Sequence, residues 1–389
     1  EEEPYFFAAT AFEEVPLLVT DTDSFQPVYS PDGKKVAFLS SRDEIRVIDR
    51  QSKAVNVALG KQHNYSYADG DIQFSWAADS HWMTADFASR GRIFIKNIGV
   101  FPSDGSAQPI DVSLSGYSDA VPVWSAKDDV VLWASTRFGQ RDHGSWGRES
   151  DVMAAFLTQD AYDKFRLSKE EYALKKELDK KNKSDKKDEP EDKKENKEEQ
   201  GDTAKNDADK YTEEYKEEEK PTPPLEIEWD NLDERTVRLT MHSSALGQFF
   251  LTKDASSLYY LSRFEKGFDL WEHNIREKST KLVVKLNARS ASIQQSPDGK
   301  EIFVLADGSL KSGKLGKKVK LKGIATRPVM ALNAAKERDY IFEYGWRKIK
   351  DKFYKEDFHG IDWDFMGKSY GRKLASIGHN RDLANMLSE

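Results

Sequence analysis

The chain contains no cysteine among its 389 residues. This absence excludes disulfide bonds, thiolate nucleophiles and cysteine-ligated metals. It does not assign a compartment, because secreted proteins can also lack cysteine. The sequence begins with Glu1 rather than methionine, so a signal peptide cannot be read from it. We therefore expect a location that is either cytoplasmic or periplasmic.

Long apolar runs and an excess of basic charge are also missing. No stretch approaches the ~20 apolar residues of a transmembrane helix, so we expect no membrane span. The net charge is −8, from 60 Lys and Arg against 68 Asp and Glu. No basic stripe with interleaved aromatic residues is present, which argues against a nucleic-acid partner.

Several catalytic motifs are absent as well. The chain has no Gly-x-Ser-x-Gly elbow, no His-Glu-x-x-His pair and no phosphate-binding loop. None of the seven histidines is spaced as a metal pair on one helix face. Two acidic triplets, Asp21–Asp23 and Asp69–Asp71, lack the other ligands of a calcium loop. We predict no catalytic residue, no metal and no cofactor within this chain.

The sequence does contain a repeated turn followed by a strand. Residues 29–39, YSPDGKKVAFL, combine a proline at the second turn position, a glycine at the fourth and a following β-prone run. Three of the four spacings between successive copies are close to the ~40–50 residue period of propeller blades. Copies of this unit begin at Tyr29, Trp76, Trp124, Leu251 and Gln295.

A second alternating run follows the first strand of each copy. Such alternation, with turn residues between the runs, predicts a mainly β fold, and the long period favours an incomplete β-propeller with about five visible blades. Residues 1–24, with β-prone runs at 5–9 and 15–20, are interpreted as remnants of a truncated blade. The predicted second strands are Glu44–Asp49, Arg92–Asn97, Ser150–Ala155 and Phe268–His273.

A charged insertion explains the one long spacing. Residues 167–224 consist largely of Lys, Glu, Asp and Asn, a composition that predicts disorder. A helix could begin at Ser168 and continue to Leu178, with Glu171 completing a capping box. We interpret the rest as a solvated spacer; a binding tail is the less favoured alternative. The insertion separates propeller blades at 25–166 from those at 225–336, and runs at 225–229 and 236–240 are predicted to complete the interrupted blade.

Two polar clusters are candidate functional sites. In the loop from Phe138 to Gly147, Arg141 and His143 could contact a substrate carboxylate, although a well-packed interblade loop is the favoured interpretation. The second cluster, residues 358–364, lies in a helical segment predicted from about residue 337 to the end. His359 could act as a general base, but no serine or cysteine neighbour is evident. A structural role for this turn is favoured.

The second cluster also carries a family resemblance. The run YIFEYGWRKIKDKFY at 340–354, followed by His359-Gly360-Ile361-Asp362-Trp363, closely resembles the opening of the catalytic half of tricorn-type proteases. The preceding repeats, with their SPDG-type turns and Lys/Glu-rich insertion, are similar to the bacterial homologues of that family. The resemblance covers essentially the whole chain, and the helical motif is its most specific part.

The resemblance implies a large serine peptidase of the tail-specific clan, with propellers, a helical subdomain and a separate α/β domain. The family's second propeller has seven blades, so part of the ring would be missing here. The family's catalytic serine and histidine match no position of this chain, which we expect to be inactive alone. Peptides or unfolded polypeptides are the implied substrates, and a homo-oligomer the implied assembly. The implied structural hinge motif comprises Trp346, His359, Gly360, Asp362 and Trp363.

Two other functions fit the repeats alone. A non-enzymatic propeller scaffold of the Tol-associated type would bind a peptide or protein at the mouth of the ring. The propeller of a prolyl-oligopeptidase-like enzyme would be accompanied by a Gly-x-Ser-x-Gly motif in another segment. The helical motif at residues 340–363 favours the tricorn-type interpretation over both.

Overall fold

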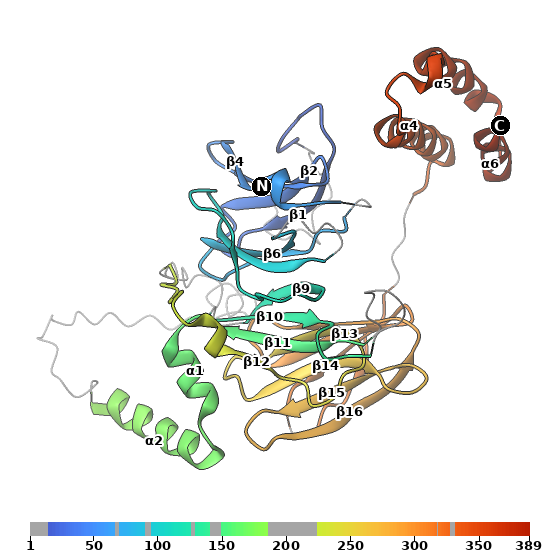
Figure 1. The fold of residues 1–389 in the computed structure, drawn as a ribbon. Helices are drawn as coiled ribbons and strands as arrows, with labels where there is room; N and C mark the ends of the chain where they lie inside the picture. Colours follow the sequence, from blue (N-terminus) through green and yellow to red (C-terminus); the bar gives the residue numbers. More distant parts are fainter. Residues whose placement is uncertain are drawn as a thin grey trace, which may run out of the picture. The chain divides into compact units, whose positions relative to one another are not determined.

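The structure is a computed structural model that describes residues 15–66, 70–89, 95–125, 129–140, 149–185, 224–316, 318–326 and 331–389. The chain divides into two compact units, Glu1–Ile324 and Ala325–Glu389. The described part of the first unit contains five antiparallel sheets of four strands each (Figure 1). Each sheet uses four strands that are consecutive in the chain, as expected for propeller blades.

The strands have the following bounds. The first two sheets contain β1 (Ser24–Tyr29), β2 (Lys35–Ser40), β3 (Glu44–Asp49) and β4 (Val55–Leu59), then β5 (Phe74–Trp76), β6 (Trp82–Phe87), β7 (Asn97–Pro102) and β8 (Ile110–Asp111). The third contains β9 (Asp119–Trp124), β10 (Val130–Ser135), β11 (Asp151–Phe156) and β12 (Thr236–Arg238). The last two contain β13 (Ala245–Leu251), β14 (Ser257–Arg263), β15 (Phe268–Asn274) and β16 (Ser279–Ala288), then β17 (Ala291–Gln295), β18 (Glu301–Ala306), β19 (Ser309–Lys314) and β20 (Lys322–Gly323).

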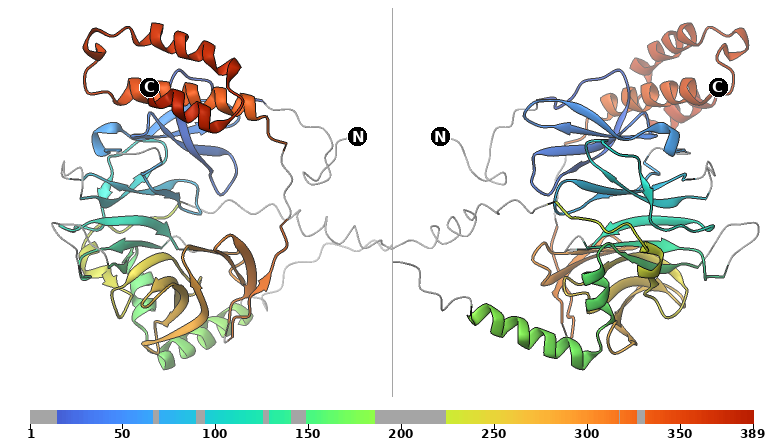
Figure 2. Two further views of the ribbon diagram at one scale, coloured as in Figure 1. Left: turned by 90° about the vertical axis from the view of Figure 1, so that its right-hand side faces the viewer. Right: turned by 60° about the vertical axis from the view of Figure 1, so that its left-hand side comes forward.

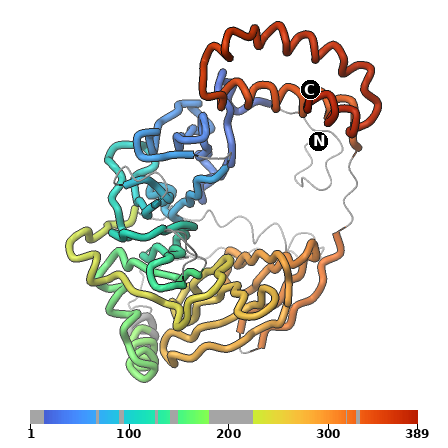
Figure 3. The backbone as a smooth tube through the Cα atoms, turned by 45° about the vertical axis from the view of Figure 1, so that its right-hand side comes forward, coloured from blue at the N-terminus to red at the C-terminus, as the bar shows by residue number. Residues whose placement is uncertain are grey.

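The sheets pack face to face in chain order, which the tube in Figure 3 follows from blue to orange. Strand β10 shows how one strand serves two interfaces. Val130 and Leu132 join the cluster shared with the fourth sheet, whereas Val131 and Trp133 join the cluster shared with the second. Successive side chains of a strand point to opposite faces, so an apolar run buried on both faces suits a blade inside the stack.

The first sheet is covered on its outer face by the segment that precedes it. On the first sheet, Val36, Phe38 and Ile48 form a small cluster against which Leu17 and Leu18 pack. The predicted strand at 15–20 is therefore wrong: this segment forms no strand, and its leucines cap the outer face of the sheet. The other predicted remnant strand, at 5–9, lies outside the described residues.

The SPDG turn has the same geometry in its first and last copies. Ser30 Oγ accepts a hydrogen bond from Lys35 N at 2.9 Å and donates one to Asp32 Oδ1. Ser296 repeats both contacts, with Glu301 N and Asp298 Oδ1. The glycine that follows each aspartate has a positive φ, +67° at Gly33 and +76° at Gly299, which explains why the turn requires that residue.

The third strand of the second sheet, β7, runs from Asn97 to Pro102. Of the strand predicted at Arg92–Asn97, residues 92–94 lie outside the described residues, and only Asn97 is part of β7. Asn97 pairs with Phe87 at the end of β6, and Ile98, Val100 and Phe101 are fully buried. The run from Asn97 to Pro102 is buried at every position, so it lacks the alternation by which strands were predicted.

The insertion begins with two helices, α1 (Gln159–Arg166) and α2 (Lys169–Asp185), drawn in green in Figures 1 and 2. Helix α1 was not predicted, and α2 extends past Leu178, where the prediction ended. The capping box is present: Ser168 N donates to Glu171 Oε2 at 2.8 Å, and Glu171 N donates to Ser168 Oγ at 3.2 Å. Residues 186–223, which were predicted to be disordered, lie outside the described residues.

The return from the insertion also differs from its prediction. Strand β12 completes the third sheet by pairing with β11, but residues 225–229 form no strand. The carbonyl of Glu228 in this segment instead accepts from the buried side chain of Arg235, which also donates to the carbonyl of Phe156 in β11. The guanidinium thus satisfies carbonyl groups that a neighbouring strand would otherwise pair.

The second unit is helical and includes the red group of Figure 2. Helix α4 starts at Ala334 with Asn333 as its N-cap, slightly before the predicted start near residue 337. Its buried core contains Phe342, Leu383 and Met386. None of the helices in the described part is long and apolar enough to cross a bilayer. The helices are α4 (Ala334–Lys352), α5 (Trp363–Gly371) and α6 (Asn380–Ser388), with 3₁₀ turns at Phe358–Gly360 and Arg372–Ser376.

Candidate functional site

The first predicted cluster cannot be placed as a site. Arg141 and His143 lie outside the described residues, so their contact with a substrate stays a prediction. The described base of this loop is narrow. Gln140 N donates to Glu149 Oε2 at 3.0 Å, and a Cβ added to Gly139 would lie 2.2 Å from the Glu149 carbonyl oxygen. A glycine is therefore needed where the two arms of the loop meet.

The second cluster is assembled around Trp363. Its ring stacks between those of Trp346 and Phe358, with centroid distances of 4.2 and 4.7 Å. The two indoles also exchange backbone contacts, because Trp346 Nε1 donates to Trp363 O at 3.3 Å and Trp363 Nε1 donates to Trp346 O at 3.4 Å. The tryptophans therefore fix the end of α4 against the start of α5.

The turn that carries His359 has an unusual backbone. Phe358, His359 and Gly360 all have positive φ angles, of 49°, 57° and 82°. His359 Nε2 shares a hydrogen bond with the Tyr354 hydroxyl, and Asp362 caps α5 by accepting from Phe365 N at 2.9 Å. These contacts hold His359 in the turn while its side chain stays exposed, and no described serine is hydrogen-bonded to it. Its role as part of a structural hinge stays a prediction.

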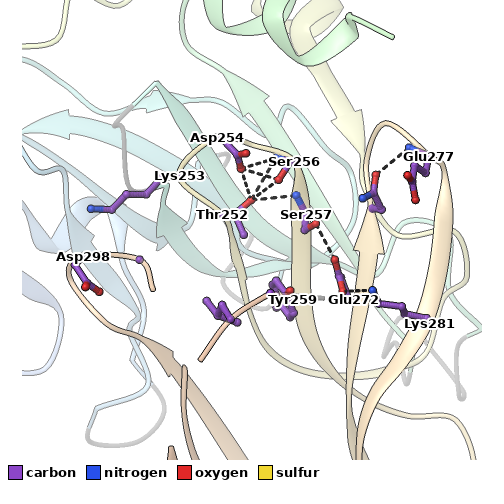
Figure 4. A pocket seen from close by; sticks show the side chains of 14 residues that line it. Thr252, Lys253, Asp254, Ser256, Ser257, Tyr259, Glu272, Glu277, Lys281 and Asp298 are labelled. Carbon is purple, nitrogen blue, oxygen red and sulfur yellow. Dashed lines mark hydrogen bonds and ion pairs between the residues drawn. The ribbon is translucent and has the colours of Figure 1, made fainter. Parts of the chain in front are cut away.

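A polar pocket that the sequence did not predict lies in the first unit (Figure 4). Its volume is about 560 Å³, and it opens between the repeated turns of the fourth and fifth sheets. Lys253 joins the two turns by donating from Nζ to Pro297 O at 2.6 Å. The lining residues come from turns more than 40 positions apart and from the β15–β16 hairpin, so no local motif marks the pocket. Its acidic members are Asp254, Glu272, Glu277 and Asp298.

Glu272 is the most buried charge of the pocket, at 7% exposed. Its Oε1 accepts from Ser257 Oγ at 2.9 Å, and its Oε2 forms an ion pair with Lys281 Nζ at 2.8 Å that lacks the geometry of a directed hydrogen bond. Burial raises the pKa of the neighbouring Tyr259, and the negative charge of Glu272 raises it further. Tyr259 therefore stays protonated and can serve only as a neutral hydrogen-bonding group near neutral pH.

The acidic residues at the rim are held ionised by local contacts. Hydrogen bonds from Ser296 and Lys300 lower the pKa of Asp298 to about 2. Glu277 pairs with Lys169 of α2, whose ammonium contact lowers the pKa of that carboxyl. The pocket can therefore hold a polar or cationic group, but it contains no activated nucleophile. Within the described residues, no serine hydroxyl is hydrogen-bonded to a histidine, and no group of three or more His, Asp or Glu could hold a metal.

Comparison with known proteins gives one match to the helical unit and one that covers most of the chain. Residues 334–389 match the family described as the tricorn protease C1 domain. The chain is also similar in structure to the crystal structure of the tricorn protease, with a TM-score of 0.61 and 13% identity, over 94% of this chain and 32% of that one. The chain thus spans about a third of the length of the tricorn protease it matches. No curated protein is detectably similar to it in sequence.

Two further solved structures are similar at lower TM-scores. A putative TolB from Agrobacterium tumefaciens is 11% identical over 78% of this chain and 81% of its own, with a TM-score of 0.44. A puromycin-hydrolyzing peptidase from Mycobacterium tuberculosis is 13% identical over 76% of this chain and 37% of its own, at 0.41. Neither value supports an inference about function. The predicted mainly β, propeller-like fold and the predicted resemblance are both confirmed: residues 334–389 match the tricorn protease C1 domain family, and the chain as a whole has a tricorn protease-like fold.

Proposed function

We propose that this chain is the substrate-access part of a tricorn-like serine peptidase that degrades peptides or unfolded polypeptides. One observation carries the proposal. The last propeller strand, β20, ends at Gly323, and the tricorn C1 domain begins at residue 334 of the same chain. A propeller joined this closely to a tricorn helical domain is not expected of a free-standing binding scaffold.

The described residues support a role in admission rather than in bond cleavage. A serine peptidase needs a hydroxyl activated by a base and donors that stabilise the oxyanion. The described part of the chain holds no serine–histidine pair. His359 is hydrogen-bonded to Tyr354 in an exposed turn, and His143 lies outside the described residues. We therefore assign substrate selection and passage to this chain and acyl transfer to other parts of the peptidase.

The first strands of the sheets suggest how a polypeptide passes without being captured. Each of these strands is an edge of its sheet, and an exposed edge can pair with an extended chain. Register shifts interrupt β1 between Phe25 and Val28 and β13 between Leu246 and Phe249, and β9 is interrupted opposite β10. Such bulges weaken strand addition. An unfolded substrate would therefore contact the edges transiently.

A cleavage assay tests the assignment of roles. The purified chain is incubated with a set of fluorogenic peptides, beside a heat-denatured sample of the same preparation. We expect no hydrolysis above that control, because the described residues provide no activated nucleophile. Hydrolysis that co-purifies with the chain and is stopped by a serine-directed inhibitor would contradict the proposal. Formation of a homo-oligomer by the full-length protein stays a prediction.

A further inference from the structure

Asp119 is a fully buried carboxylate at the start of β9. Its exposed fraction is 0%, and its backbone N–H donates to Lys96 O at 2.9 Å. Neither carboxylate oxygen has a hydrogen-bond partner of acceptable geometry, and no ion pair reaches it from the described residues. A buried carboxylate without a partner is strongly disfavoured unless another group compensates its charge.

Three buried serines surround this carboxylate. Ser113 and Ser115 follow β8 of the second sheet, and Ser135 ends β10 directly opposite Asp119 in the third sheet. Burial raises the pKa of Asp119, and the nearby hydroxyls of Ser135, Ser115 and Ser113 only partly offset that effect. The carboxylate therefore lies beside three hydroxyls at the junction of two sheets.

Two of the three serine hydroxyls also have hydrogen-bond partners other than Asp119. Ser113 Oγ donates to Asp111 Oδ1 at 3.1 Å and accepts from Ile98 N at 3.1 Å. Ser115 Oγ donates to the Tyr117 carbonyl at 3.4 Å and accepts from the Tyr117 N–H at 3.0 Å. The protons of these two hydroxyls thus have acceptors other than Asp119. The serines therefore compensate the negative charge of Asp119 only in part.

A second carboxylate adds to this negative charge. Both oxygens of Asp111 accept hydrogen bonds, from Leu114 N at 3.0 Å and from Asn97 Nδ2 at 2.8 Å. Its charge also raises the pKa of Asp119. In the second sheet, the charge of a buried carboxylate is compensated by an ion pair instead, because Asp86 pairs with Lys96 Nζ at 3.3 Å. No described lysine or arginine forms an ion pair with Asp119.

We propose that Asp119, with the hydroxyl oxygens of Ser113, Ser115 and Ser135, binds a hard cation, Na⁺ or Ca²⁺, that ties the second sheet to the third. Hard cations prefer carboxylate and neutral oxygen ligands, and a single ion would compensate both carboxylates. The proposed site is not a cluster of acidic residues. Only the Asp119 carboxylate has oxygens without a hydrogen-bond partner of acceptable geometry, and the other proposed ligands are hydroxyls. The inference is independent of the proposed peptidase role.

The test compares ion-dependent stability in three forms of the chain. Each is stripped with a chelator, dialysed into buffer whose bulk cation is tetramethylammonium, and melted during titration with CaCl₂ or NaCl. For the unmodified chain we expect a saturable rise in Tm with one of the two salts, and one bound ion per chain by elemental analysis. Asp119→Asn should lose the response. Asp86→Asn, the matched buried control, should lose stability but keep the response, because Lys96 already neutralises that site.

Each other outcome overturns the proposal. No response to either salt in the unmodified chain would show that no cation binds. An unchanged response in Asp119→Asn would place the ion elsewhere, and an ion-insensitive but more stable Asp119→Asn would show that the native carboxyl is kept neutral. If Asp119→Asn does not fold, Ser135→Ala retains the carboxylate, and its apparent ion affinity should fall by about tenfold. An unchanged affinity in Ser135→Ala would contradict the ligand assignment.

Discussion

Asp86 shows how a charged side chain is accommodated inside the propeller. Its carboxylate accepts a hydrogen bond from Gln73 N at 2.9 Å and pairs with Lys96 Nζ, while its side chain is only 4% exposed. Burial raises its pKa to about 6, and the Lys96 charge offsets part of that increase. The folded state therefore holds a proton on Asp86 at pH values where the unfolded chain has released it.

This difference predicts a pH dependence of stability. A group whose pKa is raised on folding stabilises the protein fully below its unfolded pKa, near 4, and that stabilisation is lost as the pH rises through about 6. Asp86→Asn does not titrate and should remove this component. The difference in unfolding free energy between the two forms should thus change by about 2 kcal/mol between pH 4 and pH 7. Urea unfolding across that range measures it, and parallel pH profiles would contradict the assignment.

At the scale of elements, two glycines in the helical unit have opposite surroundings. A Cβ added to Gly367 in α5 would lie 2.6 Å from Trp346 Nε1. A Cβ added to Gly345 in α4 would meet no atom within 4 Å. Neither residue has a positive φ. Only Gly367 is therefore required by packing, since it admits the indole of the stacked pair Trp346 and Trp363.

The two alanine substitutions are matched tests of this packing. Gly367→Ala should destabilise the helical unit by about 1–3 kcal/mol, because the new methyl group displaces the Trp346 ring. Gly345→Ala should stabilise it by about 0.5–1 kcal/mol, because alanine favours the helix without a steric cost. Urea unfolding followed by tryptophan fluorescence reports both. Equal effects of the two changes would show that the tryptophan stack does not constrain α5.

Several elements could be predicted because their patterns are local. The alternating runs predicted β3, β11 and β15 closely, and the capping box at Ser168 marked the start of α2. Other elements depend on distant groups. Residues 225–229 alternate like a strand, yet the carbonyls of Glu228 and the following Asp230 accept hydrogen bonds from Arg235 instead. Helix α1 is short, and its apolar residues can be recognised as one helix face only from their packing against Phe156 of the neighbouring sheet.

At the scale of the whole molecule, the candidate sites differ in how far sequence could reveal them. The turn around Trp363 is one continuous segment with a specific resemblance, so its residues could be named before its geometry was known. The pocket around Glu272 joins turns of two separate repeats, and the environment of Asp119 joins two sheets. These sites form where blades stack on one another. The sequence repeats predict the blades, but they do not show which residues of neighbouring blades meet.

The central claim, that this chain admits unfolded polypeptide to a tricorn-like peptidase, is tested most directly by a binding comparison. One fluorescently labelled test protein is used in two forms: folded with its disulfides intact, and unfolded by reduction and carboxymethylation. Fluorescence anisotropy is then measured during titration with the 389-residue chain. We predict saturable binding of the unfolded form, weakened by added salt if the acidic pocket contributes, and no binding of the folded form. Equal binding of both forms, or binding of neither, would contradict the account.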